Sequence, residues 1–334
     1  MFVKPKDDVE AVHLLTDSIK KVKSEIAKVI IGQDQIVNDL LVSLLSRGNC
    51  LLIGVPGLAK TLLIKTLADV LELKFNRIQF TPDLMPSDIT GTEIIEDDSI
   101  SKKKEFRFIQ GPIFANIVLA DEINRTPPKT QSALLEAMQE HKVTAAGVTR
   151  KLEEPFFVLA TQNPIEQEGT YPLPEAQLDR FMFNLWLDYP SYEDEIQIIK
   201  STTSDYDPHV EKILNAEEII YFQNLVKRVP VAENVIEFAV KFVNSTRPAN
   251  SKYEFVKEKV AWGAGPRASQ YLIIAAKTKA IIEGRFTPSI DDVKSFLIPV
   301  LRHRIIPNFS AEAEGITSVD IINNISKDIW IKNY

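Results

Sequence analysis

A glycine-rich octapeptide, Gly54-Val55-Pro56-Gly57-Leu58-Ala59-Lys60-Thr61, constrains this chain more than any other segment. It follows the apolar run 50–53 and precedes a helix-like pattern over 62–68. In a strand, glycine-rich turn and helix, backbone N–H groups and the helix N-terminus can face phosphates. The lysine of such a loop supplies a positive charge to the β- and γ-phosphates, and the hydroxyl that follows it can ligate Mg²⁺. The octapeptide therefore predicts a nucleoside triphosphate site.

The residue before the lysine is Ala59, where the usual pattern G-x-x-x-x-G-K-[ST] has glycine. That position enters the first helical turn, where φ is negative, so we expect alanine to fit there without backbone strain. A loop that binds no ligand stays an open alternative for the octapeptide taken alone. The predicted nucleotide contacts in this segment are Gly54, Pro56, Gly57, Leu58, Ala59, Lys60, Thr61 and Leu62.

Composition places the chain among ordinary globular proteins. It has 334 residues, 45% hydrophobic and 25% charged, and this length predicts about two domains. The net charge of −7 argues against a constitutive binder of nucleic-acid backbones, which is usually basic, although a local basic channel is compatible with it. The single cysteine, Cys50, excludes an internal disulfide and a cysteine-rich zinc site, and we expect it to be a small buried hydrophobe.

Localisation follows from the absence of signals. No run approaches the roughly 18 apolar residues that span a bilayer, and the N-terminus lacks the apolar core of a signal peptide, so we expect a cytoplasmic protein without membrane insertion. The four histidines are scattered, without the spacing of metal ligands. We interpret Trp186 and Trp262 as packing residues rather than a platform on which bases stack.

The first 188 residues alternate between helical and strand-like patterns. A hairpin is predicted near 92–110 and another near 143–153. We interpret the charged tip of the first, with Lys102-Lys103-Lys104, as a solvated tip, and contact with a partner or nucleic acid is the alternative. The alternation predicts an αβα sandwich around a mainly parallel five-stranded sheet. Its predicted helices are 9–29, 35–46, 62–68 and 127–139, and its strands 50–53, 75–80, 117–120, 156–160 and 182–187.

After Tyr189-Pro190 the strand-like patterns stop. We therefore place a domain boundary at residue 190, with a nucleotide-binding core over 1–189 and a smaller all-α domain over 190–334. The helices predicted in this second domain are 191–202, 216–228, 232–246, 266–284 and 289–304.

Polar side chains follow two of the predicted strands. Asp121-Glu122 ends the strand 117–120, and Asn163 stands just past the strand 156–160. Because ligands of doubly wound sheets bind beyond the carboxyl ends of the strands, these side chains can meet the glycine-rich loop. Asp121 would hold Mg²⁺, largely through water, and Glu122 would polarise the attacking water. Asn163 would orient that water against the γ-phosphate, or would form an Asx turn before the proline that follows it.

Longer stretches resemble a known family, the MoxR family of AAA+ ATPases. Asp121–Met138 resembles its Walker B segment and the helix that follows, and Thr81–Gly91 resembles the start of its insert within the second helix. Ala160–Pro164 resembles sensor 1. The octapeptide is the form of Walker A that MoxR proteins carry, so Ala59 matches the family. The resemblance covers nearly the whole chain and implies an AAA+ αβα core followed by a helical lid domain.

The resemblance also implies roles that spacing does not give. Arg180 falls where the family has its arginine finger, which reaches the γ-phosphate bound by the neighbouring subunit; an ordinary surface Asp–Arg pair is the alternative. Arg267 matches sensor 2 at the start of a lid helix and would contact the γ-phosphate from the lid. Ile31 and Gly32 resemble the segment that lines the adenine. We assign Arg125, near the expected subunit boundary, no firm role.

Together these observations imply an ATPase that uses ATP and Mg²⁺ and works as a homo-oligomeric ring, with a hexamer expected. Proteins of the MoxR family are thought to be chaperones that mature or activate protein complexes, often with von Willebrand factor A domain partners. A nucleic-acid motor or loader is one alternative, supported by the lysines at the hairpin tip and opposed by the net charge. A magnesium-chelatase-like ATPase subunit is another. The sequence names no client.

Overall fold

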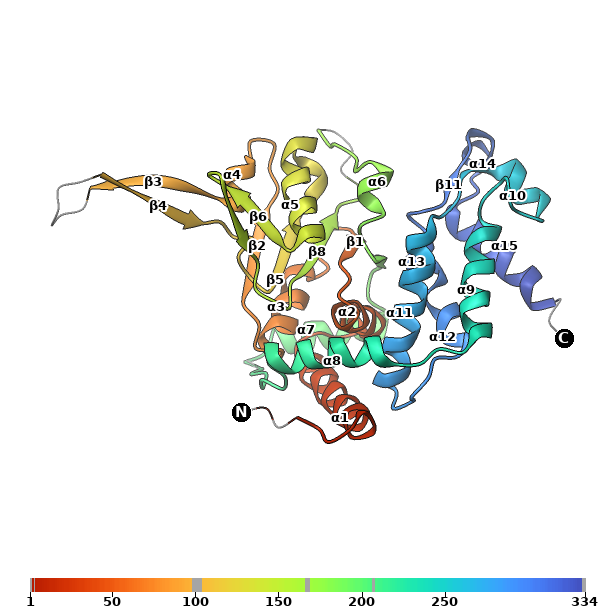
Figure 1. The fold of residues 1–334 in the computed structure, drawn as a ribbon, viewed down its shortest axis with the longest axis horizontal. Coiled ribbons are helices and arrows are strands. Elements are labelled where there is room, and N and C mark those ends of the chain that lie inside the picture. The colour runs from red at the N-terminus through yellow and green to blue at the C-terminus, as the bar shows by residue number, and fades with distance from the viewer. Residues whose placement is uncertain (1, 3, 98–103, 166–168, 206–207, 332–334) are drawn as a thin grey trace.

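A five-stranded parallel sheet forms the centre of the N-terminal half of the chain (Figure 1). Its strands are β1 Cys50–Gly54, β2 Phe75–Gln79, β5 Ile117–Asp121, β8 Phe157–Gln162 and β9 Phe183–Leu187. They lie in the order β2-β5-β8-β1-β9, and every neighbouring pair is parallel. This computed structural model describes residues 2, 4–97, 104–165, 169–205 and 208–331.

Helices cover both faces of the sheet, because alternate residues of a strand point to opposite sides. These helices are α1 Asp8–Ala27, α2 Asp34–Leu45, α3 Lys60–Val70 and α5 Pro128–Glu140. Ile117 and Leu119 of β5 pack into a core with α1, α2 and α3, whereas Val118 and Ala120 pack into a second core with α5. The apolar run of β5 is therefore buried on both sides, and the predicted αβα sandwich is confirmed.

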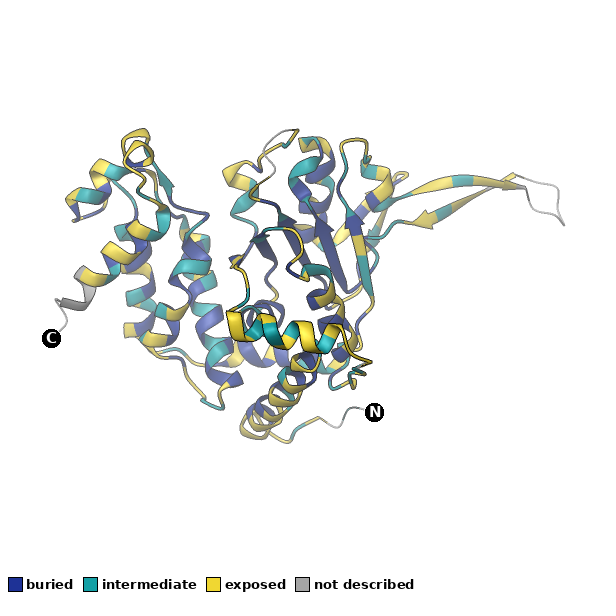
Figure 2. Cartoon of the chain, turned by 180° about the vertical axis from the view of Figure 1, so that it is seen from behind, coloured by how far each residue is buried: buried dark blue, intermediate teal, exposed yellow. Residues whose placement is uncertain are grey.

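Two antiparallel hairpins are attached to this core. β3 Gly91–Asp97 pairs with β4 Lys104–Gln110, and β6 Lys142–Ala145 pairs with β7 Val148–Lys151. The first hairpin projects from the body of the molecule (Figure 1), and its described side chains are mostly exposed (Figure 2). Of the predicted basic tip, Lys102 and Lys103 lie outside the described residues, and Lys104 begins β4.

The base of the projecting hairpin is narrow because two glycines meet there. Gly91 has a φ of +96°, and a Cβ on it would overlap the carbonyl oxygen of Ile109. A Cβ on Gly111 would overlap the carbonyl oxygen of Ile89. Both positions therefore require glycine. The short helix α4, Pro86–Thr90, leads into this base and lies against α5.

The C-terminal region is helical, as predicted for a lid. Its helices are α7 Tyr192–Thr202, α8 Ala216–Arg228, α9 Glu233–Ser245, α10 Glu254–Lys259, α11 Pro266–Ile282, α12 Ile290–Ser295, α13 Leu297–Leu301, α14 Phe309–Ala313 and α15 Ser318–Ile331. It also contains a short antiparallel pair, β10 Val260–Trp262 with β11 Ile306–Pro307, which the all-α expectation did not include. Strands of two or three residues are too short to show a periodicity in sequence.

The helical region packs closely on the N-terminal helices. Gln223 of α8 donates a 2.8 Å hydrogen bond to the carbonyl oxygen of Leu44, and the hydroxyl of Thr16 donates one of 3.0 Å to the carbonyl oxygen of Ile281. Because α8 contacts α1, α2 and α11, the domain boundary at residue 190 stays a prediction. Within the described ranges, no helix combines the length and apolarity needed to cross a bilayer.

Candidate nucleotide site

Three adjacent strands end beside the glycine-rich loop. β8 lies between β1 and β5, and all three are parallel, so their carboxyl ends share one edge of the sheet. The loop follows β1, Asp121 is the last residue of β5, and Asn163 is the first residue after β8. This strand order brings the loop, the acidic pair and the asparagine to one place, where parallel α/β sheets bind their ligands.

The glycine-rich loop is held by its own lysine. Lys60 Nζ donates hydrogen bonds to the carbonyl oxygens of Gly54 at 2.5 Å and Val55 at 3.1 Å. Burial lowers the pKa of Lys60, and the carboxylates of Asp121 and Glu122 act in the opposite direction. The charges of both carboxylates therefore act on the lysine and favour its protonated form.

The loop has an open face. Gly57 has a φ of +87°, and no atom lies within 4 Å of the position that its Cβ would take. The predicted adenine segment adjoins this loop, since Gln33 Nε2 donates a 3.4 Å hydrogen bond to the carbonyl oxygen of Leu58. In the same segment Gly32 has a φ of +73°, and a Cβ there would overlap the Asp194 side chain of α7. The adenine contacts of Ile31 and Gly32 stay a prediction.

A buried hydroxyl aligns the two acidic residues. Thr161 Oγ1, which is fully buried on β8, donates a 2.6 Å hydrogen bond to Asp121 Oδ1 and accepts one of 2.9 Å from the backbone N–H of Glu122. The other oxygen of Asp121, Oδ2, accepts hydrogen bonds from Arg77 at 2.6 Å and 3.1 Å. Charge-assisted bonds of this kind orient the Asp121 carboxylate without any ligand.

The Glu122 side chain is held by two donors. Its Oε2 accepts a 3.1 Å hydrogen bond from Gln79 Nε2 and one of 3.2 Å from an Arg125 guanidinium nitrogen. Gln79 ends β2 and lies opposite Asp121 in the register of β2 with β5. The Glu122 backbone is left-handed, with a φ of +56°, and turns the chain from β5 into the 3₁₀ helix Ile123–Arg125.

Asn163 forms the local turn that was one of its two expected roles. Its Oδ1 accepts a 3.1 Å hydrogen bond from the backbone N–H of Ile165, which is an Asx turn. The side chain is 6% exposed and lies at the strand end between the loop and Asp121. The turn uses the carbonyl oxygen of the amide, so its NH₂ group is the end that could meet water or phosphate. The two roles are therefore compatible.

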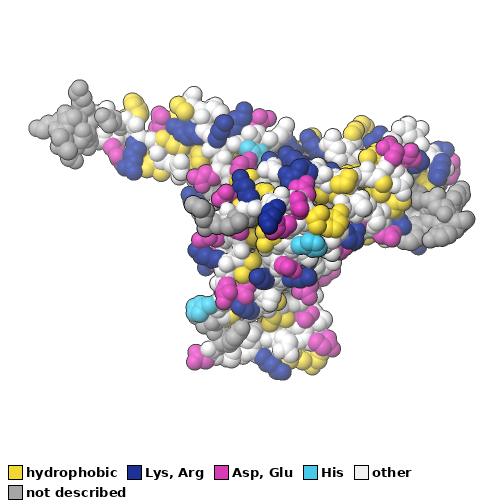
Figure 3. Space-filling view, turned by 60° about the horizontal axis from the view of Figure 1, so that its bottom comes forward, with side chains coloured by type: hydrophobic (Ala, Val, Ile, Leu, Met, Phe, Trp, Pro, Cys, Tyr) yellow, Lys and Arg dark blue, Asp and Glu magenta, His cyan; other side chains and the backbone are white. Residues whose placement is uncertain are grey.

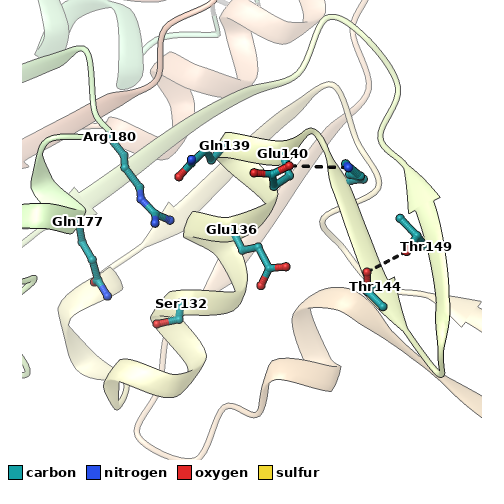
Figure 4. A pocket seen from close by; sticks show the side chains of 9 residues that line it. Ser132, Glu136, Gln139, Glu140, Thr144, Thr149, Gln177 and Arg180 are labelled. Atoms are coloured by element: carbon teal, nitrogen blue, oxygen red, sulfur yellow. Dashed lines mark hydrogen bonds and ion pairs between the residues drawn. The ribbon is translucent and has the colours of Figure 1, made fainter. Parts of the chain in front are cut away.

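Arg180 lies on a different part of the core. It follows the short helix α6, Glu175–Leu178, and its guanidinium donates a 2.9 Å hydrogen bond to the carbonyl oxygen of Leu135 in α5. Figure 4 shows the Arg180 side chain directed over a cavity of about 520 Å³ that α5 and the β6–β7 hairpin border. The described residues lining it are Ser132, Glu136, Gln139, Glu140, Lys142, Thr144, Thr149, Gln177 and Arg180, none of them in the glycine-rich loop.

Arg267 is bound to the residue before Arg180. Its guanidinium donates to the carboxylate of Asp179 at 2.8 Å, and its side chain is 40% exposed. It is the second residue of α11, next to Gly265 and Pro266 at the helix start. Asp179 therefore connects the predicted lid arginine, Arg267, to the segment that carries the predicted arginine finger, Arg180.

Two family models match the chain. The first is the ATPase family associated with various cellular activities (AAA), over residues 49–183, and the second is the AAA lid domain, over residues 253–325. The chain is also 44% identical over 319 residues to "Chaperone MoxR1" of Mycobacterium tuberculosis, which covers 95% of this chain and 82% of that protein. The chain belongs to the MoxR family of AAA ATPases.

Other relatives of this MoxR-family chain agree with that assignment. Protein YeaC of Bacillus subtilis is 42% identical to it, over 93% of this chain and 94% of YeaC. A protein from Cytophaga hutchinsonii with a crystal structure is 42% identical, and its fold matches this one with a TM-score of 0.89. The match covers 95% of this chain and 96% of that one. Membership in an AAA ATPase family implies that the protein binds and hydrolyses ATP.

The MoxR-type loop departs from the sequence expectation at Ala59. We expected a negative φ, but Ala59 has a φ of +54° and a ψ of 25°, in the left-handed region, as the N-cap of α3. An L-residue with a Cβ is strained there by about 1–2 kcal/mol. The expectation was wrong because the residue caps the helix rather than entering it, and the cap adopts a conformation that suits glycine.

Three residues of the MoxR-family site were not predicted from sequence, namely Arg77, Gln79 and Thr161. Arg77 and Gln79 lie on β2, and their proximity to the acidic pair follows from the β2–β5 pairing, which no local pattern reveals. A signal for Thr161 was available, because it is a hydroxyl residue at the end of a buried apolar strand. Such a residue must find a hydrogen-bond partner, and Asp121 is that partner.

Outside the MoxR-type site, the structure bears on the expectations for Cys50 and for the two tryptophans. Cys50 is fully buried, and burial raises the pKa of its thiol. Over the described ranges, no group of three or more His, Cys, Asp or Glu residues could hold a metal ion. Trp186 is 54% and Trp262 70% exposed, so neither is a core residue, and the Arg302 guanidinium lies over the Trp186 ring. Residue type alone did not predict this exposure, because apolar atoms make up much of a protein surface.

Proposed function

We propose that the protein hydrolyses Mg-ATP as a homo-oligomeric ring, with six subunits expected, and that Arg180 of one subunit completes the ATP site of the next. The observation that carries the proposal is the separation of Arg180 from the glycine-rich loop and its lysine. Lys60 begins α3 on one face of the sheet, whereas Arg180 is bonded to α5 on the other face. An arginine placed in this way meets a phosphate if a second subunit presents one.

The residues at the sheet edge suit magnesium. Thr61 offers a hydroxyl and Asp121 a carboxylate, and Mg²⁺ prefers such hard oxygen ligands together with water and phosphate oxygens. The metal would neutralise charge on the phosphates. Lys60 would give up its hydrogen bonds to the loop carbonyl oxygens and bond phosphate oxygens instead. Glu122 would orient and polarise the attacking water. Asn163 would hold that water from the neighbouring strand end, and Arg267 would contact the γ-phosphate from the lid.

We further propose that hydrolysis remodels a protein complex, and the name of the M. tuberculosis relative, which calls that protein a chaperone, supports this proposal. The projecting β3–β4 hairpin supports a protein client. Ile95 and Phe106 lie opposite each other on it and are 58% and 71% exposed. Apolar side chains exposed together on a projecting element suit contact with another protein. A partner with a von Willebrand factor A domain is the specific client that we would test first.

A nucleic-acid motor receives less support. The net charge is −7, and Figure 3 shows acidic and basic side chains interspersed over the face it displays, without a continuous basic surface. A basic stripe is the usual electrostatic footprint of a protein that binds a phosphate backbone.

The hydrolytic mechanism is tested with Glu122→Gln, which keeps the size of the side chain and one acceptor oxygen and removes the charge. This variant should bind ATP and retain it unhydrolysed, and wild-type turnover would refute the role of Glu122. Because it should hold the client-bound state, its capture of partners in the presence of ATP, compared with Lys60→Ala under the same conditions, tests the remodelling function.

The shared site is tested by mixing inactive subunits. Arg180→Ala supplies an ATP site without a finger, and Lys60→Ala supplies a finger without a working ATP site. Each variant alone should be inactive, and the mixture should recover ATPase activity, since a finger supplied in trans can be worth about 10³–10⁵ in rate. A mixture as inactive as its components would contradict the action of Arg180 in trans.

A further inference from the structure

The segment that carries Arg180 is attached to the lid through every one of its carbonyl groups. This segment, residues 179–182, connects α6 to β9. Four consecutive backbone carbonyl oxygens accept hydrogen bonds from lid side chains. They are Asp179 O from Arg304 at 2.9 Å, Arg180 O from Tyr271 at 3.4 Å, Phe181 O from Arg304 at 2.6 Å, and Met182 O from Arg304 at 3.3 Å.

Arg304 makes most of these contacts and is almost completely buried. The residue is 5% exposed, and its Nε donates a 2.8 Å hydrogen bond to Asp179 Oδ1. Burying a guanidinium is costly unless its charge is paired and its N–H groups are bonded. Asp179 supplies the paired carboxylate, so this aspartate is needed for Arg304 to remain among the carbonyl groups of the segment.

The second oxygen of Asp179 binds the other lid arginine. Asp179 Oδ2 accepts the 2.8 Å hydrogen bond from Arg267 at the start of α11. One carboxylate therefore joins two separate parts of the lid, α11 and the turn after α13. The Arg180 side chain leaves the same segment in another direction, toward α5 and the cavity of Figure 4.

We propose that Asp179 is a positioning residue that makes the placement of Arg180 depend on the lid of the same subunit. The proposal rests on the proposed action of Arg180 in trans. A change in the position of one lid would then alter the active site of the neighbouring subunit, because the lid and the finger share the segment 179–182. Asp179 itself touches neither nucleotide nor water in this scheme.

Loss of the Asp179 charge should displace the finger without emptying the ATP site. In Asp179→Asn, Arg304 loses its paired carboxylate and the lid loses its hold on the segment. A displacement of about 1 Å in a group that must meet a transition state can cost about 100-fold in rate. We therefore expect kcat to fall by about that factor, with the affinity for ATP unchanged.

The decisive experiment places Asp179→Asn in one component of the mixed rings. The Lys60→Ala component supplies the working Arg180, and the Arg180→Ala component supplies the working ATP site. If Asp179 positions the finger, Asp179→Asn lowers the recovered activity by about 100-fold in the Lys60→Ala component. In the Arg180→Ala component, where only Arg267 of the ATP site loses a partner, the loss should be much smaller. Equal loss in both components, or loss in neither, would overturn the proposal. Failure of the unmodified mixture to recover activity would instead refute the trans action of Arg180.

Two further variants separate positioning from a loss of stability. Asp292→Asn breaks a different buried contact of the lid, the pair of 2.7 Å hydrogen bonds from Arg285, and should give no dependence on which component carries it. Arg304→Lys keeps the charge beside Asp179 but cannot reproduce the contacts to the three carbonyl groups. It should reproduce the component dependence of Asp179→Asn, so the test remains decisive if Asp179→Asn does not fold. Ring assembly is checked for each mixture by native mass spectrometry.

Discussion

Gln79 donates a 3.1 Å hydrogen bond from its side-chain amide to the carboxylate of Glu122. Gln79 ends β2, and Glu122 directly follows the neighbouring strand β5, so both lie at the same edge of the sheet. Because Arg125 donates to the same carboxylate oxygen, Glu122 is held by two donors at once. The residue expected to polarise water is therefore oriented by two side chains of the protein itself.

Replacement of Gln79 by alanine should slow hydrolysis by about tenfold, because a general base contributes roughly 10²–10⁴ in rate when correctly placed and part of that depends on its orientation. The affinity for a non-hydrolysable ATP analogue should not change. Steady-state kinetics and equilibrium binding measure the two quantities. Gln270→Ala, an exposed glutamine on α11, is the matched control. An undiminished kcat in Gln79→Ala would show that this contact does not orient the base.

Ala59→Gly should stabilise the protein although it introduces glycine at a helix start. The left-handed φ of +54° costs alanine about 1–2 kcal/mol, whereas glycine loses about 0.5–1 kcal/mol more conformational entropy on folding. The net gain is therefore up to about 1.5 kcal/mol, measurable as a higher urea midpoint. Ala176→Gly in α6, an exposed helical alanine, should lower the midpoint instead. Equal destabilisation by both changes would contradict strain at Ala59.

Asp39 should make stability fall as the pH rises. This residue of α2 is 7% exposed, and burial raises the pKa of its carboxyl to about 6, against an ordinary value near 4. The folded state then binds the proton more tightly, so its stabilisation is full below about pH 4 and is lost as the pH rises through 6. Asp39→Asn should therefore stabilise the protein at pH 8, by about 2–3 kcal/mol at most.

Urea unfolding of Asp39→Asn at pH 5 and pH 8 tests this sign. Asp8→Asn is the control of opposite sign, because the hydrogen bond from Arg228 lowers the pKa of the exposed Asp8. Its stabilising contribution exists above the unfolded pKa, so Asp8→Asn should give at most a small loss at both pH values. A variant of Asp39 that is no more stable than the wild type at pH 8 would refute the buried-charge argument.

The exposed pair on the projecting hairpin should matter for clients and not for folding. Ile95→Ser with Phe106→Ser should leave the free energy of unfolding within about 0.5 kcal/mol, because both side chains are exposed. Basal ATPase activity should persist, and capture of partners by the Glu122→Gln form should decrease at least severalfold. Val148→Ser, on the other hairpin and 50% exposed, controls for a general loss of surface apolarity. Unchanged capture would exclude the pair from client contact.

Sequence pattern predicted the strands of the sheet and its parallel character, but it did not predict the order of the strands. The run 117–120 is apolar because β5 is covered on both faces, and that property is local enough to be visible. The position of β8 between β1 and β5 depends on long-range pairing, which a local sequence pattern does not show. The contacts of Arg77 and Gln79 follow from such pairing, which explains why the outer part of the site was missed.

The helix predicted over 289–304 shows a second limit of periodicity. The structure divides it into α12 and α13 at Phe296, and residues 302–305 no longer continue the helix. Pro299 lies in α13 and has no backbone N–H to bond the carbonyl oxygen of Ser295, which disfavours a continuous helix. The break places Arg304 beyond α13, where it turns toward Asp179.

The paired glycines make the base of the projecting hairpin much narrower than the hairpin is long. Seven residues of β3 extend about 23 Å at roughly 3.3 Å per residue. Gly91 and Gly111 bring the two chains so close that the base occupies little more than one strand spacing, about 5 Å. A small tilt of α4 against α5 would therefore become a displacement several times larger at the far end. Side chains near the far end of the hairpin would then move by several ångströms when the core moves by a fraction of an ångström.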